Sequence, residues 1–161
     1  MDQPFRPPEA ILAYRSLRDI LRDKLGKVWS IAPSDSVLSA LQTMTSKNIG
    51  FLPVMEGGKL VGVISERDCA RRAAQPGKPL DATQVAEIMV RNVITVDFTH
   101  KFADCLRLMH DNRIRHLPVI DGSSVVAVLS VRDLLSEAVS HHSKIIRELE
   151  RERMQMLTSM V

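Results

Sequence analysis

The chain has 161 residues, a net charge of +3 and a pI of about 9.1, with 45% hydrophobic and 25% charged residues. This is ordinary globular composition and gives no reason to expect disorder. Since the basic residues are interleaved with Asp and Glu, we expect no strong nucleic-acid footprint. The start of the sequence has no apolar signal-peptide core, and no apolar run is long enough to span a membrane, so we expect a cytoplasmic protein.

The N-terminal part carries an amphipathic pattern. Residues 9–24 place apolar side chains at roughly helical spacing, with Arg, Asp and Lys between them. This pattern predicts a helix that leads into the rest of the chain, and Gly26 is a plausible stop for it. We assign residues 1–27 to an N-terminal extension.

The rest of the sequence contains an internal repeat. Residues 28–70 recur at 93–135, with an offset of 65 and no gap. Shared apolar positions indicate only that the two segments fold alike, but a polar Ser-x-Arg-Asp motif is also shared. The residues with an identical counterpart are Val28, Leu41, Met44, Ile49, Leu52, Pro53, Val54, Gly57, Val61, Val63, Ser65, Arg67 and Asp68.

Each copy predicts the same order of elements, β-α-β-β-α, which is an α/β (α+β) fold. A short strand comes first, Val28–Ile31 or Val93–Val96, and the last helix starts at Ser65 or Ser130. Because a small sheet covered on one face cannot bury both faces, we expect the copies to pack into one pseudo-twofold domain. The predicted inward faces of the first helices are Val37, Ala40, Leu41 and Met44, and Phe102, Cys105, Leu106 and Met109.

The repeat also gives the domain boundaries. They are a first repeat at 28–76, a linker at 77–92, a second repeat at 93–140 and a C-terminal tail at 141–161. The stretch Leu134–Met156 is typical of a long helix rich in Lys, Arg and Glu, with a thin apolar stripe. We expect the amphipathic segments 9–25 and 134–157 to help hold a homodimer, because a lone chain would struggle to cover their apolar stripes.

The repeated motif, Ser65–Asp68 and Ser130–Asp133, has two interpretations. As a Ser-x-x-Asp capping box it stabilises the start of a helix without any ligand. As a binding motif, the helix N-terminus and Arg67 or Arg132 would favour a phosphate, and the Asp would accept hydrogen bonds from ribose hydroxyls. The repeated Arg, which a cap does not require, favours binding, and one Ser can serve both roles.

Taken together, the motifs resemble the CBS domain, named after cystathionine beta-synthase. The first copy carries the resemblance in Ile49–Val54 and Leu60–Asp68, and the second in Ile114–Val119 and Val128–Asp133. The chain looks like the small stand-alone bacterial proteins that consist of one tandem CBS pair, a Bateman module. The resemblance covers about residues 16–140.

This resemblance implies a regulatory sensor and not an enzyme. CBS pairs bind adenine nucleotides, AMP, ADP, ATP or NAD among them, in clefts between the repeats, form homodimers and act through an effector protein. With only 4% aromatic residues, we expect aliphatic walls around the adenine, and Gly62 is expected to let the backbone approach a ligand closely. The candidate residues are Asp68 and Asp133 for ribose; Ser65, Arg67, Ser130, Arg132, Arg115 and His116 for phosphate; and Val28, Ile49, Val93 and Ile114 for the adenine pocket.

Two other functions remain open from the sequence. One is a constitutive dimerisation module with empty clefts, and the other is a nucleic-acid-binding regulator, which only the pI and the basic tail suggest. No nucleophile–base pair points to catalysis. Cys69 and Cys105 have no CxxC spacing, and the pair His141-His142 lacks further ligands at zinc spacing, so we expect no metal site.

Overall fold

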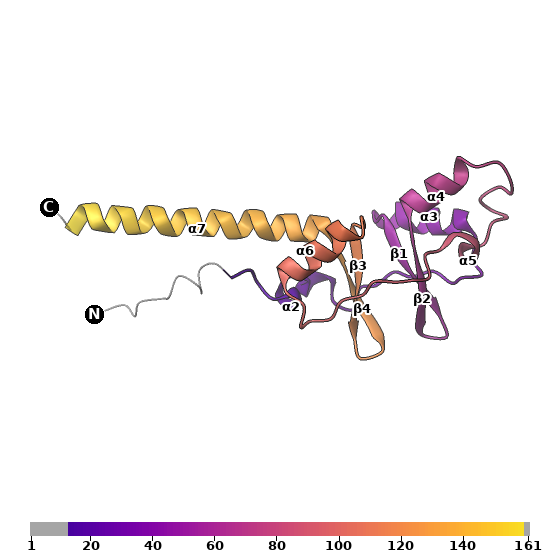
Figure 1. Ribbon diagram of the computed structural model, residues 1–161, viewed down its shortest axis with the longest axis horizontal. Helices are drawn as coiled ribbons and strands as arrows, with labels where there is room; N and C mark the ends of the chain where they lie inside the picture. Colours follow the sequence, from indigo (N-terminus) through magenta and orange to yellow (C-terminus); the bar gives the residue numbers. More distant parts are fainter. Residues whose placement is uncertain (1–12, 160–161) are drawn as a thin grey trace.

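The computed structural model describes residues 13–159, and its elements repeat in the predicted order. The first repeat has α3 (Val37–Lys47), β1 (Phe51–Glu56), β2 (Lys59–Ser65) and α4 (Glu66–Ala73); the second has α6 (Phe102–Asp111), β3 (His116–Asp121), β4 (Ser124–Ser130) and α7 (Val131–Ser159). Three short helices lie outside these sets: α2 (Leu17–Ile20), the 3-10 helix η1 (Arg22–Lys24) and α5 (Val85–Ile88). Figure 1 shows the two repeats side by side, with α7 extending away from them. The predicted α+β class is confirmed.

The two hairpins are built alike. Each pairs its strands antiparallel, and each has a register shift, after Val54 in the first and after Val119 in the second. Each turn contains a glycine with positive φ, +55° at Gly57 and +61° at Gly122, where a side chain would be strained. The two copies of the repeat therefore share their register shift and their positive-φ glycine as well as their strands.

The predicted opening strands are reduced to single parallel bridges, Ile31 to Val54 and Val96 to Val119. A longer parallel ladder would need a backbone N–H from the residue just before Val54 or Val119. That residue is a proline in both repeats, Pro53 in the first and Pro118 in the second. Proline has no backbone N–H to donate. The prediction of full strands at 28–31 and 93–96 is therefore wrong.

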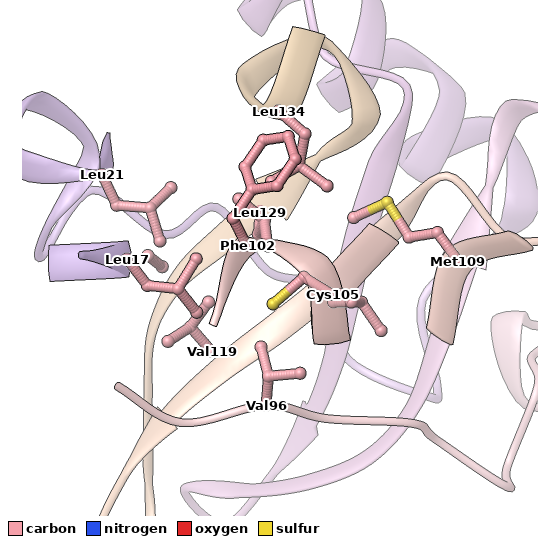
Figure 2. Packing of buried hydrophobic residues seen from close by; sticks show 11 residues of the cluster. Leu17, Leu21, Val96, Phe102, Cys105, Met109, Val119, Leu129 and Leu134 are labelled. Atoms are coloured by element: carbon pink, nitrogen blue, oxygen red, sulfur yellow. The ribbon is translucent and has the colours of Figure 1, made fainter. Parts of the chain in front are cut away.

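Each repeat has its own hydrophobic core, completed by a short helix from outside it. The first core includes Val85 and Met89 of the linker, whereas the second includes Leu17 and Leu21 of the N-terminal segment (Figure 2). Each short helix thus packs on a repeat other than the one that it directly precedes. The two repeats are interdependent through this exchange of helices, and not through one common core.

The predicted helix at 9–24 is mostly absent. Residues 9–12 lie outside the described residues, and the rest is helical only in α2 and η1. The Ser16 side chain caps α2 by accepting a hydrogen bond from the Asp19 backbone N–H at 3.2 Å. Leu17 and Leu21 of this segment are buried, and Tyr14, Ile20 and Leu25 are half-buried against the second core, so the described part of 9–25 does not expose the expected apolar stripe.

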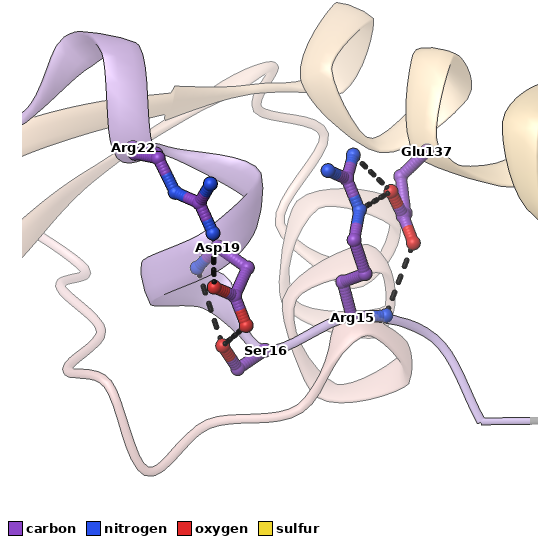
Figure 3. A network of polar contacts seen from close by, with 5 residues as sticks. All are labelled: Arg15, Ser16, Asp19, Arg22 and Glu137. Atoms are coloured by element: carbon purple, nitrogen blue, oxygen red, sulfur yellow. Dashed lines mark hydrogen bonds and ion pairs between the residues drawn. The ribbon is translucent and has the colours of Figure 1, made fainter. Parts of the chain in front are cut away.

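The residues just before α2 anchor the segment to α7. The Arg15 backbone N–H donates to Glu137 Oε1 at 3.0 Å, and its Nε donates to Glu137 Oε2 at 2.7 Å (Figure 3). The Tyr14 ring stacks on Phe102, with centroids 3.8 Å apart, and also lies against His141 at 4.5 Å. These contacts hold the first turns of α7 against the second repeat.

The predicted helix faces are largely confirmed. Val37, Ala40 and Met44 are buried in α3, and Phe102, Cys105 and Met109 are buried in α6. Leu41 is only half-buried, and Leu106 is 44% exposed, so its placement on the inward face is wrong. The buried stripe of α6 follows a spacing of three and then four residues from Phe102, and this spacing passes Leu106 by.

The last helix, α7, confirms the predicted long helical tail. It runs unbroken for 29 residues, and none of its described residues beyond His141 is buried. Among the described helices, we find none that combines the length and the apolar character needed to cross a bilayer.

Candidate functional site

A cleft of about 720 Å³ lies between the two repeats. One side is formed by the first repeat and the segment just before it, and the other by the start of α7 and the start of β3. The cleft is lined by Lys24, Lys27, Val28, Trp29, Met44, Thr45, Asn48, Ile49, Gly50, Phe51, Glu66, Arg115, His116, Val128, Ser130, Val131 and Arg132. A bound molecule would therefore contact both repeats.

Both Ser-x-Arg-Asp motifs form capping boxes. The Ser65 backbone N–H donates to Asp68 Oδ2 at 2.9 Å, and Ser65 Oγ accepts from the Asp68 N–H at 3.3 Å. The corresponding distances for Ser130 and Asp133 are 2.7 and 3.3 Å. The structural interpretation of the motif is thus confirmed. Within residues 13–159, Oδ1 of each carboxylate has no hydrogen-bond partner, which leaves it available to a ligand.

The helix N-terminus itself has few free donors. The Val131 backbone N–H donates to the Arg115 carbonyl at 2.9 Å, and the Asp133 N–H is used in the cap. Of the first three N–H groups of α7, only that of Arg132 lacks a partner among the described residues. Attraction for a phosphate must therefore come mainly from side chains, and less from the helix end than the motif predicts.

The cleft is strongly cationic. Its lining includes four basic side chains, Lys24, Lys27, Arg115 and Arg132, and one carboxylate, Glu66. Glu66 lies beside Gly50, where an added Cβ would be 3.0 Å from Glu66 Oε2, so the absence of a side chain at Gly50 leaves room for this carboxylate. The excess of positive charge favours an anionic ligand.

One of these cations is already paired. Lys24 Nζ lies 2.7 Å from Asp133 Oδ2, and the Asp133 side chain is only 17% exposed. Lys24 comes from η1, which packs on the second repeat, so the exchange of the N-terminal segment brings it to the cleft. Sequence reasoning missed Lys24 and Lys27, because both precede the repeated region and have no counterpart motif.

Aromatic side chains line the cleft beside the predicted aliphatic residues Val28 and Ile49. Phe51 and His116, which are related by the repeat, stack with centroids 4.9 Å apart. Burial, and next the positive charge of Lys24, lowers the pKa of His116, so the imidazole is neutral at physiological pH. Trp29 is 49% exposed, with Lys47 Nζ 3.9 Å from its ring centroid. The low aromatic content of the chain does not reveal that Trp29 and Phe51 lie at this cleft.

The structure brings together half of the predicted site residues. Val28, Ile49, Arg115, His116, Ser130 and Arg132 line the cleft, and Asp133 adjoins it through Lys24. Ser65, Arg67, Asp68, Val93 and Ile114 are not among the lining residues. The division follows the pseudo-twofold symmetry, because this cleft combines the opening of the first repeat with the motif of the second.

Gly62 has a packing role that differs from the prediction. A Cβ added there would lie 2.7 Å from Met89 Sδ and 3.1 Å from the Val90 carbonyl oxygen. The linker packs directly on β2 at this point, and Val63 and Val90 exchange two backbone hydrogen bonds of 2.9 Å. Glycine is therefore needed for the approach of the linker, and not for that of a ligand.

The two cysteines are unreactive in this fold. Both are buried, and burial, followed by the charge of the preceding aspartate, raises the pKa of each thiol to about 11. Neither thiol is ionised near neutral pH, so neither is activated as a nucleophile.

Comparison with known proteins identifies the fold family. The CBS domain family matches the chain at residues 17–75 and 85–140. The Arabidopsis thaliana protein "CBS domain-containing protein CBSX3, mitochondrial" is 32% identical in an alignment of 158 positions that covers 91% of this chain and 76% of that protein. The crystal structure of the CBS domain protein NE2398 is 42% identical, with a TM-score of 0.74 over 78% of this chain and 98% of that one.

A further solved structure contains ligands. The CBS domain pair of protein MJ0100, in complex with 5′-methylthioadenosine and S-adenosyl-L-methionine, is 30% identical, with a TM-score of 0.65 over 76% of this chain and 94% of that one. The matched ranges, the repeated elements and these relatives lead to one assignment. The chain belongs to the CBS domain family, as a tandem pair of CBS repeats.

Proposed function

We propose that this chain is a regulatory module that binds an adenine nucleotide in the cleft between its repeats. The observation that carries the proposal is the grouping of Lys24, Lys27, Arg115 and Arg132 around one cleft to which both repeats contribute. Four cationic side chains facing one carboxylate favour the phosphates of a nucleotide over an uncharged nucleoside.

The nucleoside part of the ligand is supported by a relative and by the cap geometry. The MJ0100 pair was solved with two adenosine-containing ligands. In this chain, Asp133 offers Oδ1 as an acceptor for a ribose hydroxyl, while its Oδ2 stays in the helix cap. AMP, ADP, ATP and NAD all carry this combination of ribose and phosphate.

A regulatory role follows from the position of the cleft. A ligand that contacts both repeats shifts their relative arrangement if it binds one arrangement more tightly than the other. The start of α7 lines the cleft through Val131 and Arg132, so the proposed movement reaches the long helix directly. In this proposal the module acts in the cytoplasm on an effector protein.

A second site is proposed at the pseudo-twofold counterpart of the cleft. It would use Asp68 for ribose, Ser65 and Arg67 for phosphate, and Val93 and Ile114 beside the adenine. If both sites bind, calorimetry should give two nucleotides per chain. If only the cleft described above binds, it should give one.

The test is calorimetric titration of the full chain with adenosine, AMP and ATP. We expect affinity to rise with phosphate number, and Arg115→Ala to weaken ATP more than adenosine. Losing one charge-assisted contact removes about 1.5–3 kcal/mol, so ATP affinity should fall by at least about tenfold.

The matched control is Arg71→Ala, which removes an exposed arginine of α4 that does not line the cleft. This variant should bind all three ligands like the native chain. Equal affinity for adenosine and ATP, or equal weakening of both by Arg115→Ala, would contradict a phosphate-binding cleft. No binding of any adenine compound would contradict the proposed function itself.

A further inference from the structure

Helix α7 exposes a row of large apolar side chains that residues 13–159 leave uncovered. The exposed fractions are 60% for Leu135, 66% for Val139, 56% for Ile146, 59% for Leu149 and 65% for Met156. Beyond the contacts near Tyr14, the helix extends away from both repeats (Figure 1). An apolar row of this length on a helix surrounded by water indicates a missing partner.

The spacing of the row is that of a coiled coil. Starting at Leu135, steps of four and three residues alternate through Val139, His142, Ile146, Leu149, Arg153 and Met156. An average step of 3.5 residues keeps such a row on one face when two helices wind around each other. We call these seven positions the α7 seam.

Charge at the polar end of the seam favours a parallel copy of the same helix. Arg153 occupies a core position of the heptad, and Glu152 occupies the flanking position just before it. In a parallel pair, the arginine of each helix lies beside the flanking residue of the other, so it would meet the partner's Glu152. Off the seam, Lys144, Arg147, Glu148 and Arg151 supply a solvated face.

We propose that α7 pairs with α7 of a second copy of this chain as a parallel two-stranded coiled coil along the α7 seam. The site and its ligand are not involved, so this inference is independent of nucleotide binding. The pairing would place the bases of the two α7 helices, and hence the two clefts, at the same end of the assembly. It covers the exposed row without disturbing the contacts of Arg15 with Glu137.

The first test measures mass in solution by light scattering at micromolar concentration. We expect twice the 18.0 kDa mass of the chain. Ile146→Glu combined with Leu149→Glu should return the chain to a monomer, because it places like charges at two neighbouring seam positions. Met154→Glu is the matched control, since Met154 is 63% exposed on the same helix but lies off the seam, and it should stay dimeric.

The second test fixes the direction of the helices. Leu149→Cys should form an intermolecular disulfide on mild oxidation, because equivalent core positions face each other in a parallel, in-register pair. Met154→Cys should not, and the native Cys69 and Cys105 are buried and remain silent. A monomeric native chain, or a dimer that survives the double seam substitution, would overturn the proposal. A dimer lost by that substitution but not crosslinked through Leu149→Cys would overturn the parallel arrangement.

Discussion

Lys24 and Asp133, 109 residues apart in the sequence, form an ion pair of 2.7 Å at the edge of the cleft. The carboxylate that the sequence predicts as the ribose acceptor therefore already has a cationic partner. Lys24 is about half exposed, with 47% of its side chain accessible, so it is free to turn. Lys24 binds Oδ2 and leaves Oδ1 free, so Lys24 and a ribose hydroxyl at Oδ1 would compete for the negative charge of one carboxylate, whereas a phosphate nearby would attract the ammonium group of Lys24.

This competition predicts opposite effects of one substitution on two ligands. Lys24→Met should strengthen adenosine binding, because Asp133 is freed, and weaken ATP binding, because a phosphate partner is lost. Each change in affinity should be at most about fivefold, since a partly exposed ion pair contributes about 0.2–1 kcal/mol. Calorimetry with both ligands measures it. The control is Lys27→Met, which removes a cleft cation that has no ion pair among the described residues. It should weaken ATP binding without strengthening adenosine binding. If Lys24→Met changes the affinity for both ligands in the same direction, the competition is excluded.

The two aspartates provide an internal comparison, because their caps are alike and only Asp133 adjoins the cleft. Asp68→Ala and Asp133→Ala should each destabilise the fold by about 0.5–2 kcal/mol through loss of a helix cap. Only Asp133→Ala should also remove the preference for adenosine over 2′-deoxyadenosine in this cleft, a preference of about 1–3 kcal/mol for a lost buried hydrogen bond. Thermal unfolding and calorimetry separate the two effects. If that preference survives Asp133→Ala, Asp133 does not bind the ribose.

The sequence predicts the repeated units well because each copy of the internal repeat can be compared with the other. Two copies that share Pro, Gly and Ser-x-Arg-Asp at the same offset must share hairpins and caps, and both do. The shortness of the opening strands could not be predicted in this way, although Pro53 and Pro118 deny them a hydrogen-bond donor. That argument requires the register, which only the structure supplies.

The site was less predictable because it depends on contacts between segments with no local pattern. The exchange of α2 and α5 between repeats brings Lys24 to Asp133. No sequence pattern around either residue predicts that pairing. Likewise, composition predicts few aromatic residues but not the position of Phe51 at the cleft, where it stacks on His116. The repeat predicts what each unit contains, whereas the packing of the units decides which candidates meet.

His116 should make the stability of the fold depend on pH. Burial lowers its pKa in the folded state below the ordinary value of 6.5. The unfolded chain therefore binds the proton more readily, so stability is full above about pH 6.5 and is lost as the pH falls from there through the folded pKa. His116→Phe keeps a ring against Phe51 and should flatten this dependence. Denaturant unfolding at several pH values measures it, and an unchanged slope in the variant would assign the dependence to another group.

The anchor of α7 gives a second pH-dependent test. Glu137 is buried, which alone would raise its pKa, but its hydrogen bonds from Arg15 outweigh burial and lower it. Arg15→Ala leaves this carboxylate with the backbone N–H as partner and should destabilise the fold by about 1–3 kcal/mol near neutral pH.

The loss of folding stability caused by Arg15→Ala should become smaller as the pH falls. In the native chain, the lowered pKa of Glu137 contributes stability that is present above its unfolded value of 4.5 and lost as the pH falls through the folded pKa. In the variant, burial prevails and the carboxyl takes up a proton more readily, so acid relieves the penalty. Arg22→Ala, which removes a 76% exposed arginine paired only with Asp19 three residues away, should change stability by less than about 0.5 kcal/mol at any pH. Equal destabilisation by Arg15→Ala at neutral and mildly acidic pH would show that Arg15 acts through packing and not through the charge of Glu137.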